Sequence, residues 1–297
     1  MKKVYALLVL IAVSLSCNAQ LLWKVSGGNT FKPSYLFGTI HLETAQYIDS
    51  VPGLNEALNE VDAVYGEIFK DDLVNPEVMM KMMKDVMAPA DSTIDKLITS
   101  EEYKLVDSVA KSYLLGMVGL EQLKKFKPVV VSTQLSILQM QKYFPDFTGT
   151  ENGIDMALQT KGIALGKHVA GLETVDDQMA ALFGAPLTEQ AQDLVDFCRN
   201  DINIMEYSKM LCNAYHAQDL KAIEDIVCDP VLGMDEEQMD RLANDRNIKW
   251  MDKIKMMLPV QGVMIVVGAA HLVGDKGLIT QLRELGYTVE PVTIQKK

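Results

Sequence analysis

The stretch YLFGTIH at residues 35–41 is the starting point for interpreting this chain. It is a short apolar and aromatic run, typical of a buried strand, and it ends in Gly-x-x-His. Residues 263–271, VMIVVGAAH, show the same pattern after a longer apolar run. Because a glycine at a strand end allows a sharp turn, each histidine is expected at a sheet edge, where α/β proteins bind ligands. Only four histidines occur in the chain, and His41 and His271 occupy matching places.

A further strand is predicted close to the first motif. Residues 63–68, AVYGEI, read as a buried strand that carries a carboxylate, Glu67, where the strand would end. Residues 52–61 lie between the two strands and have apolar side chains at helical spacing. This strand–helix–strand order predicts two parallel strands, with His41 and Glu67 at the same edge of the sheet.

The C-terminal part is predicted to form a second unit of this kind, with strands at 263–267 and 287–294 around a helix at 276–285. Between the two strand-rich ends, residues from about 70–258 read as largely helical, and no low-complexity linker separates the parts. We therefore predict one α/β domain over residues 20–297. It would contain a mixed central sheet flanked by helices, with a large helical insertion between its N- and C-terminal halves.

Three features of the helical middle have ordinary interpretations. Residues 167–172 read as a short strand, and His168 at its start is expected at the sheet edge opposite the other two histidines. His216 lies on a polar helical stretch, so both histidines are interpreted as structural or solvated. The methionine cluster at 79–83 could bind copper or line an adaptable groove, but its helical spacing favours core packing.

The first residues have the features of a secretory signal peptide. Residues 1–19 combine a basic start, an apolar run at 4–13 and a small, polar end, and the run is too short for a convincing membrane span. Cleavage after Ala19 would give an exported protein, periplasmic or extracellular. Alternatively, Cys17 is lipidated and anchors the protein to a membrane. The usual lipobox has leucine three residues before the cysteine, and this chain has Ser14, so we favour the soluble form.

The composition is acidic. Removal of residues 1–19 takes away Lys2 and Lys3, so 26 of the 28 basic residues face 40 acidic ones, a net charge of −14. Nucleic acid is therefore not an expected partner, because its binding requires basic patches. Three cysteines remain, Cys198, Cys212 and Cys228, at spacings that indicate no disulfide framework. Two of them could form one disulfide, or all three could be buried free thiols, and the sequence leaves both alternatives open.

The two strand-end histidines and the strand-end glutamate are suitable ligands for a divalent metal ion. Neutral imidazoles and carboxylates bind zinc, manganese, cobalt or iron(II). His41, Glu67 and His271 would hold such an ion and leave positions for water and substrate, and a bound water has its pKa lowered towards ~7. Without a metal, the same groups could act as general acid and base. The residues alone leave both alternatives open.

The two Gly-x-x-His motifs and several further motifs together make the chain resemble the TraB/GumN family. This family is related to the Tiki metalloproteases and carries two Gly-x-x-His motifs near its ends. The resemblance covers almost the whole mature chain. The matching features are FGTIH at 37–41, the strand ending at Glu67, GID at 153–155, GLET at 171–174 with Gln178 following, DRN at 245–247, and VGAAH at 267–271.

This resemblance implies a mixed sheet flanked by helices, shared more distantly with erythromycin-esterase-like and haem-binding ChaN-like proteins. It also implies a site built from His41, Glu67, Arg246 and His271, with manganese- or cobalt-dependent peptide hydrolysis in the Tiki branch. Arg246 would orient Glu67 or hold a developing oxyanion. Glu173 would be a supporting or catalytic carboxylate.

We therefore predict an exported metal-dependent hydrolase, a peptidase, with manganese, cobalt or zinc as cofactor and a peptide or small molecule as substrate. Its metal ligands would be His41, Glu67 and His271, and its catalytic residues Glu67, Glu173 and Arg246. One alternative is a metal-free, esterase-like hydrolase in which His41 or Glu67 acts as the base. Another is a non-enzymatic protein that binds a peptide or haem.

Overall fold

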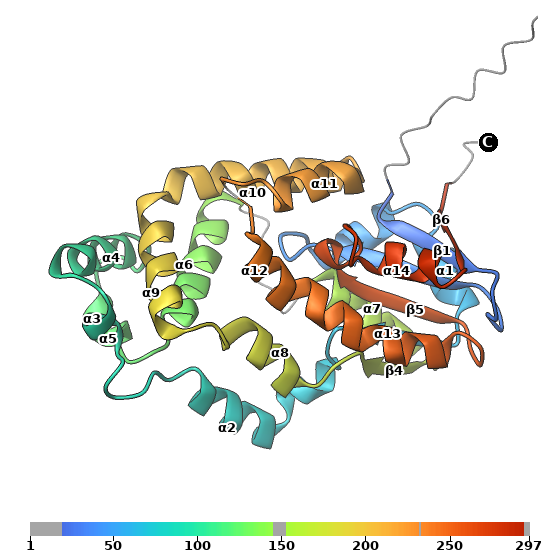
Figure 1. Ribbon diagram of the computed structural model, residues 1–297, viewed down its shortest axis with the longest axis horizontal. Helices are drawn as coiled ribbons and strands as arrows, with labels where there is room; N and C mark the ends of the chain where they lie inside the picture. The colour runs from blue at the N-terminus through green and yellow to red at the C-terminus, as the bar shows by residue number, and fades with distance from the viewer. Residues whose placement is uncertain (1–19, 145–152, 232, 294–297) are drawn as a thin grey trace, which may run out of the picture.

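A mixed six-stranded sheet lies at one end of the molecule, and helices extend from it to the other end (Figure 1). This architecture comes from a computed structural model that describes residues 20–144, 153–231 and 233–293. The predicted fold class, an α/β fold with a mixed sheet and a helical middle, is confirmed. The predicted signal peptide and the possible anchor at Cys17 lie outside the described residues.

The strand order explains why the predicted strand ends meet. The sheet runs β4-β3-β5-β2-β1-β6, in which the first four strands are parallel and β1 is antiparallel to both of its neighbours. The two N-terminal strands β2 and β3 are thus parallel as predicted, and β5 lies between them. The strands are β1 (Leu22–Ser26), β2 (Ser34–Thr39), β3 (Ala63–Gly66), β4 (His168–Gly171), β5 (Val263–Gly268) and β6 (Thr288–Pro291).

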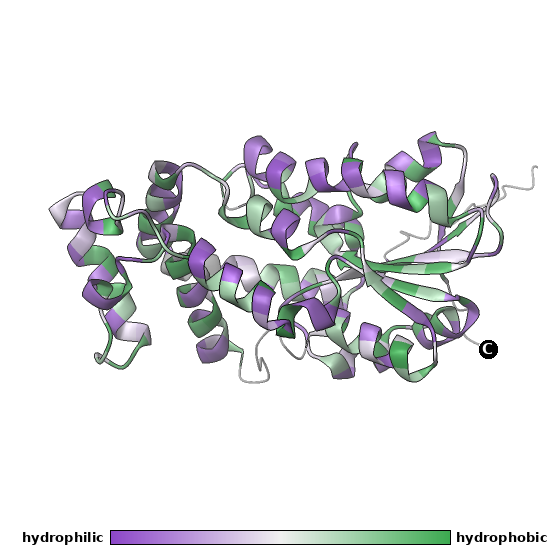
Figure 2. Cartoon of the chain, turned by 90° about the horizontal axis from the view of Figure 1, so that it is seen from below, coloured by the Kyte–Doolittle hydropathy of each residue, from purple (hydrophilic) through white to green (hydrophobic). Residues whose placement is uncertain are grey.

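Helices cover both faces of this sheet. Helices α13 (Asp245–Met257) and α14 (Leu278–Glu284) cover one face, while α1 (Leu54–Glu60) and α7 (Ile154–Ala164) cover the other (Figure 1). Strand β5 has five consecutive buried residues, as expected for a parallel strand with helices on both sides. Figure 2 shows the same layers from another direction, with hydrophilic residues on the outer sides of the helices.

The helical insertion has a small core of its own. Buried side chains of α4, α6 and α9, including Val106, Val131 and Leu194, form a cluster separate from the one around the sheet. The remaining elements are η1 (Ala45–Ser50), η2 (Lys70–Val74), α2 (Pro76–Asp85), α3 (Ile94–Leu97), α4 (Ser100–Tyr113), α5 (Leu120–Leu123), α6 (Pro128–Tyr143), α8 (Val175–Phe183), α9 (Leu187–Arg199), α10 (Asp201–His216), α11 (Leu220–Val227), α12 (Glu236–Met239), η4 (Asp240–Asn244) and η5 (Ala269–His271).

The methionine cluster does not pack in a core as predicted. Met79, Met80 and Met83 on α2 are 49%, 61% and 71% exposed, and Met82 packs only partly buried against a minor cluster. Helix α2 is stabilised locally instead. The side chain of Asn75 caps its first turn, and Pro76 occupies the first helical position. Helical spacing of apolar residues therefore predicted the helix correctly and its burial incorrectly.

Two other predictions can be compared with the structure. His168 begins β4 and pairs with Ala63, so it lies at the sheet edge opposite the ends of β2, β3 and β5, as predicted. Cys198 and Cys212 are buried free thiols, and Cys228 is an exposed one, so these three cysteines form no disulfide with one another. Within the described residues, no helix is both long and apolar enough to cross a membrane.

Candidate active site

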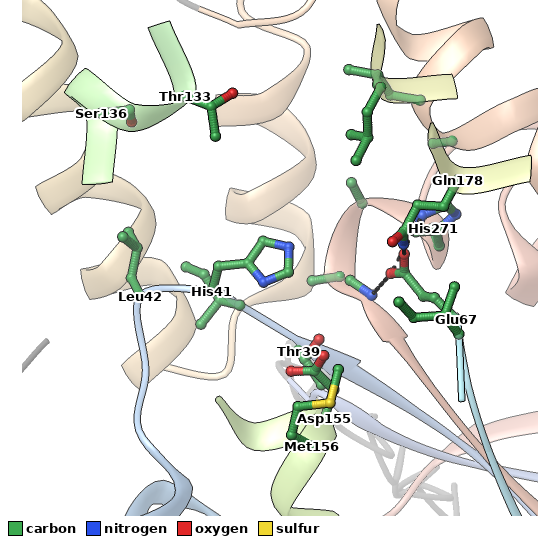
Figure 3. A pocket seen from close by; sticks show the side chains of 18 of the residues that line it. Thr39, His41, Leu42, Glu67, Thr133, Ser136, Asp155, Met156, Gln178 and His271 are labelled. Carbon is green, nitrogen blue, oxygen red and sulfur yellow. Dashed lines mark hydrogen bonds and ion pairs between the residues drawn. The ribbon is translucent and has the colours of Figure 1, made fainter. Parts of the chain in front are cut away.

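The predicted edge of the sheet opens into a large cavity. Strand register brings Thr39 of β2 opposite Gly268 of β5, so the loops that follow these strands start side by side. The cavity has a volume of about 1360 Å³, and its lining includes His41, Glu67 and His271 together with side chains from the helical insertion (Figure 3).

Glu67 follows β3 directly and lies at the base of this cavity, with its side chain 18% exposed. Its Oε1 accepts a hydrogen bond from the backbone N–H of Gly268 at 2.8 Å. Its Oε2 accepts from Arg246 Nη2 at 2.6 Å and from Gln178 Nε2 at 3.2 Å. Burial opposes the negative charge, but His271, Arg246 and the Gly268 N–H together lower the pKa of Glu67 to about 2.

Arg246 connects Glu67 to the rest of the site. Its Nε donates to both oxygens of Glu173 at 3.1 and 3.2 Å, and Nη2 donates to Glu173 Oε1 at 2.6 Å as well as to Glu67. Its Nη1 donates to the carbonyl of Leu242 at 2.7 Å and faces His271 Nε2 at 3.1 Å. These contacts use all five N–H groups of the guanidinium. The arrangement therefore favours an orienting role for Arg246 over direct donation to a substrate oxyanion.

The local backbone helps Arg246 to reach this position. Leu242 belongs to η4, a π-helical turn that leads directly into α13 and places its carbonyl beneath the guanidinium. Single π-turns inside longer helices are frequent at functional sites because they shift the side chains that follow.

Glu173 supports Arg246 from the side away from the cavity. It follows β4, its side chain is 6% exposed, and it does not line the cavity. Its Oε2 also accepts a hydrogen bond from Trp250 Nε1 at 3.1 Å. Burial raises the pKa of Glu173, and Arg246 opposes that shift. The position of Glu173 favours support of Arg246 over contact with a substrate.

His271 ends the short helix η5 and is only 4% exposed. Its Nδ1 lies 2.8 Å from Asn247 Oδ1, and its ring lies 4.5 Å from the Trp250 ring between centroids. Its Nε2 lies 3.7 Å from Glu67 Oε1. Burial lowers the pKa of His271 to about 4, although Glu67 opposes the shift, so the imidazole is neutral at pH 7.

His41 lies across the cavity from this cluster. Its ring points into the cavity towards Glu67 and His271, and Asp155 lies beside it (Figure 3). Burial raises the pKa of Asp155, and His41 opposes that shift. Within the described residues, the His41 side chain makes no hydrogen bond. The structure thus joins Glu67, Glu173, Arg246 and His271 directly. It places His41 in the same cavity, and among the described residues no hydrogen bond or ion pair links its side chain to them.

The donor types around the cavity suit a divalent ion. Two imidazoles and three carboxylates, those of Glu67, Asp71 and Asp155, line it. The Arg246 cluster carries two carboxylates for one guanidinium. Glu67 Oε1 and His271 Nε2 lie 3.7 Å apart, within reach of one ion at ~2.0–2.2 Å from each. However, no three His, Cys, Asp or Glu side chains of the described residues are gathered to hold an ion. The residues fit a metal in kind. To hold one, His41 would have to approach the other two residues, and Arg246 Nη1 would have to give up its contact with the single lone pair of His271 Nε2.

Four contributors to the site carried little signal in the sequence. Gln178 follows one of the family motifs and Asn247 ends another, DRN, but neither has a predicted role. Asp155 belongs to the GID motif, again without a predicted role, and Trp250 lies in the stretch that is predicted only as helical. The spacing of Trp250, one helical turn after Arg246, is the signal that places both side chains on one face.

Comparison with known proteins agrees with the resemblance in the sequence. A family model described as the TraB/PrgY/gumN family matches residues 21–291. The chain belongs to the TraB/PrgY/gumN family. A relative, "Metalloprotease TIKI2" of Danio rerio, is 21% identical over 318 residues, which cover 91% of this chain and 60% of that protein. The chain therefore spans less than two thirds of that relative's length. No solved structure matches this family member.

Proposed function

We propose that this protein is an exported hydrolase that depends on a divalent metal and cleaves peptide bonds. The observation that supports this most is the buried network of Glu67, Arg246 and His271 at the base of a cavity of about 1360 Å³. The description of the relative as a metalloprotease points to the same chemistry.

His41, Glu67 and His271 are the proposed ligands. A divalent ion held there would supply Lewis-acid activation of water and of the bond to be cleaved. Metal ligands must be deprotonated, and the pKa values of Glu67, about 2, and His271, about 4, meet this condition at neutral pH. A general base works best with a pKa near the working pH, so the low pKa of Glu67 supports a ligand role for this carboxylate over a role as the base.

Arg246 and Glu173 would keep Glu67 in place during the reaction. The guanidinium holds Glu67 Oε2, and Glu173 holds the guanidinium, so the Oε1 atom of Glu67 keeps a fixed direction. Glu67 Oε1 has one hydrogen bond, from Gly268, and so retains a lone pair. We assign Glu67 to the reacting site and the other two residues to its support.

The helical insertion would bind the substrate. Its contribution to the cavity is mainly apolar, with hydroxyl groups of Thr133 and Ser136 on α6 and apolar side chains of Leu182 and Phe197 on α8 and α9. Cavities for drug-sized molecules are typically about 300–1,000 Å³. The larger size found here supports an extended peptide rather than a small ester as the substrate.

Export rests on the pattern of residues 1–19, with a lipid anchor at Cys17 as the alternative. Expression of the full chain with and without Cys17→Ala, followed by fractionation and mass analysis of the mature N-terminus, distinguishes the two forms.

The activity test uses the mature chain from residue 20, purified without chelators. Metal content is measured first, and a peptide library is then incubated with added Mn²⁺ or Co²⁺. We expect cleavage by the wild type, its loss in His41→Ala and His271→Ala, and its retention in the matched control His168→Ala at the opposite sheet edge.

Each alternative gives a different result in this test. Cleavage that survives exhaustive chelation supports the metal-free hydrolase. Tight peptide or haem binding without turnover supports the binding protein. Equal cleavage by the wild type, His41→Ala and His271→Ala refutes the proposed site.

A further inference from the structure

One face of α13 holds the His271 imidazole on three sides. Arg246, Asn247 and Trp250 are spaced at i, i+1 and i+4, so their side chains project from the same face of the helix. Arg246 Nη1 lies 3.1 Å from Nε2, Asn247 Oδ1 lies 2.8 Å from Nδ1, and the Trp250 ring lies 4.5 Å from the imidazole. Both ring nitrogens and one ring face therefore have a defined partner.

The orientation of the Asn247 amide follows from its other contacts. Its Nδ2 lies 3.0 Å from the backbone carbonyl of His271 and 3.0 Å from that of Lys276. Carbonyl oxygens only accept hydrogen bonds, so the amino group of the amide must face them. Asn247 is completely buried, and the reversed amide would place an acceptor against two acceptors, an arrangement that leaves buried groups unsatisfied.

This orientation defines where the proton of His271 lies. With the Asn247 amino group on the two carbonyls, Oδ1 faces His271 Nδ1 and must accept a hydrogen bond from it. Arg246 Nη1 can only donate, and it faces Nε2, so it requires a lone pair there. Both neighbours therefore favour the same tautomer, with the proton on Nδ1.

We propose that Asn247 is a positioning residue that holds His271 in the Nδ1–H tautomer, with the Nε2 lone pair facing Arg246 and Glu67. The hydrogen bond at one imidazole nitrogen sets the state of the other, and free imidazole side chains in water favour the opposite tautomer. An ion or an acidic proton would also require this lone pair, and either would have to displace the Arg246 Nη1–H group that faces it in this structure. The importance of Asn247 for turnover rests on the proposed hydrolase function, whereas the tautomer itself does not.

The tautomer can be measured directly. The mature protein is labelled with ¹⁵N-histidine, and long-range ¹H–¹⁵N NMR spectra distinguish protonated from unprotonated ring nitrogens. With four histidines in the chain, His271→Gln assigns the signals of His271. We expect the Nδ1–H form in the wild type, and the Nε2–H form would overturn the proposal.

Two substitutions separate positioning from stability. Asn247→Asp and Asn247→Leu both remove the hydrogen bonds to the carbonyls of His271 and Lys276. Aspartate keeps an oxygen that accepts from Nδ1, so the Nδ1–H tautomer is expected to persist, whereas leucine is expected to abolish it as the single form. Identical His271 spectra in the two variants would overturn the proposal. If the leucine variant does not fold, the spectra of the wild type and of Asn247→Asp still test the proposal.

Gln190 provides a matched control in the helical insertion. It is another buried amide, and its Nε2 donates to the carbonyls of Phe183 and Ala185 at 3.1 and 2.8 Å. Gln190→Leu should lower the melting temperature and leave the His271 spectrum unchanged. In the cleavage assay, Asn247→Leu should lower kcat/KM by about 10–100-fold, and Asn247→Asp by less. Absence of cleavage by the wild type would refute the hydrolase function, while the tautomer would still be judged by its spectrum.

Discussion

Replacing Arg246 with methionine should destabilise the fold strongly, because it would leave two buried carboxylates without a cation. The side chains of Glu67 and Glu173 are only 18% and 6% exposed, and each accepts a 2.6 Å hydrogen bond from Arg246 Nη2. Removing one partner of a buried ion pair costs about 3–5 kcal/mol. At roughly 2–4 °C per kcal/mol, the melting temperature should fall by roughly 6–20 °C.

A double-mutant cycle tests the origin of this loss. Glu173→Gln removes one of the two unpaired charges, and its side-chain oxygen can still accept from Trp250 Nε1. We therefore expect Arg246→Met/Glu173→Gln to be more stable than the sum of the single effects predicts, with a coupling of about 0.5–3 kcal/mol. The measurement is urea unfolding of the four mature proteins at pH 7, without added metal.

Arg199→Met is the matched control for loss of an arginine. Arg199 pairs with Glu102 in the helical insertion, and its side chain is 46% exposed, so its loss should cost about 0–1 kcal/mol. Additive effects of Arg246→Met and Glu173→Gln, or equal losses for Arg199→Met and Arg246→Met, would refute the explanation by unpaired buried charge.

Three further predictions concern the same region. Burial lowers the pKa of His271 from 6.5 to about 4, so between these pH values the unfolded chain binds a proton that the folded chain does not bind, and stability should fall as the pH drops from about 6.5 to about 4. Urea unfolding across this range should show a smaller slope of unfolding free energy against pH for His271→Gln than for the wild type, and equal slopes would contradict the prediction. A Cβ on Gly38 would lie 3.2 Å from Ala269 Cα, whereas one on Gly268 would approach only Glu67 at 3.4 Å and the His271 ring at 3.7 Å. In unfolding experiments, Gly38→Ala should therefore cost about 1–3 kcal/mol, while Gly268→Ala should fold normally with altered activity. A larger loss of stability for Gly268→Ala than for Gly38→Ala would contradict the packing argument. Added Mn²⁺ or Co²⁺ at 100 times its Kd should stabilise the wild type by about 2.7 kcal/mol, and calorimetry should show no such gain for His271→Ala if that histidine is a ligand.

The strands at the sheet edge could be predicted because their signals are local. Unbroken apolar runs that end in glycine or a charged residue indicate buried strands, and parallel strands bring their C-terminal ends to one edge. His41, Glu67 and His271 were placed in this way, and the strand order confirms the shared edge. The insertion of β5 between β2 and β3 could not be predicted, since it depends on pairing across about two hundred residues.

The remainder of the site has no local signal. Arg246 and Glu173 look ordinary in the sequence, and only the family resemblance singled them out; their contact spans 73 positions in the chain. Two partners of Asn247 are backbone carbonyls, which every residue possesses, and the third is the ring of His271, 24 positions away in the chain. Its sequence context therefore gives no indication of what it binds. The exposed Met79 shows the converse limit, because helical periodicity indicates an apolar face but not whether another element covers it.

The two Gly-x-x-His motifs match in sequence and differ in their structural environment. His271 is almost fully buried, and Arg246, Asn247 and Trp250 contact it from one rigid helix face. The His41 side chain is exposed and, among the described residues, has no hydrogen-bond partner. Binding of an ion or substrate between them would therefore order His41 and leave His271 in place, because only His41 has side-chain freedom to lose. The two motifs thus carry one preorganised histidine and one adaptable histidine. The difference follows from α13, whose Arg246, Asn247 and Trp250 all contact His271.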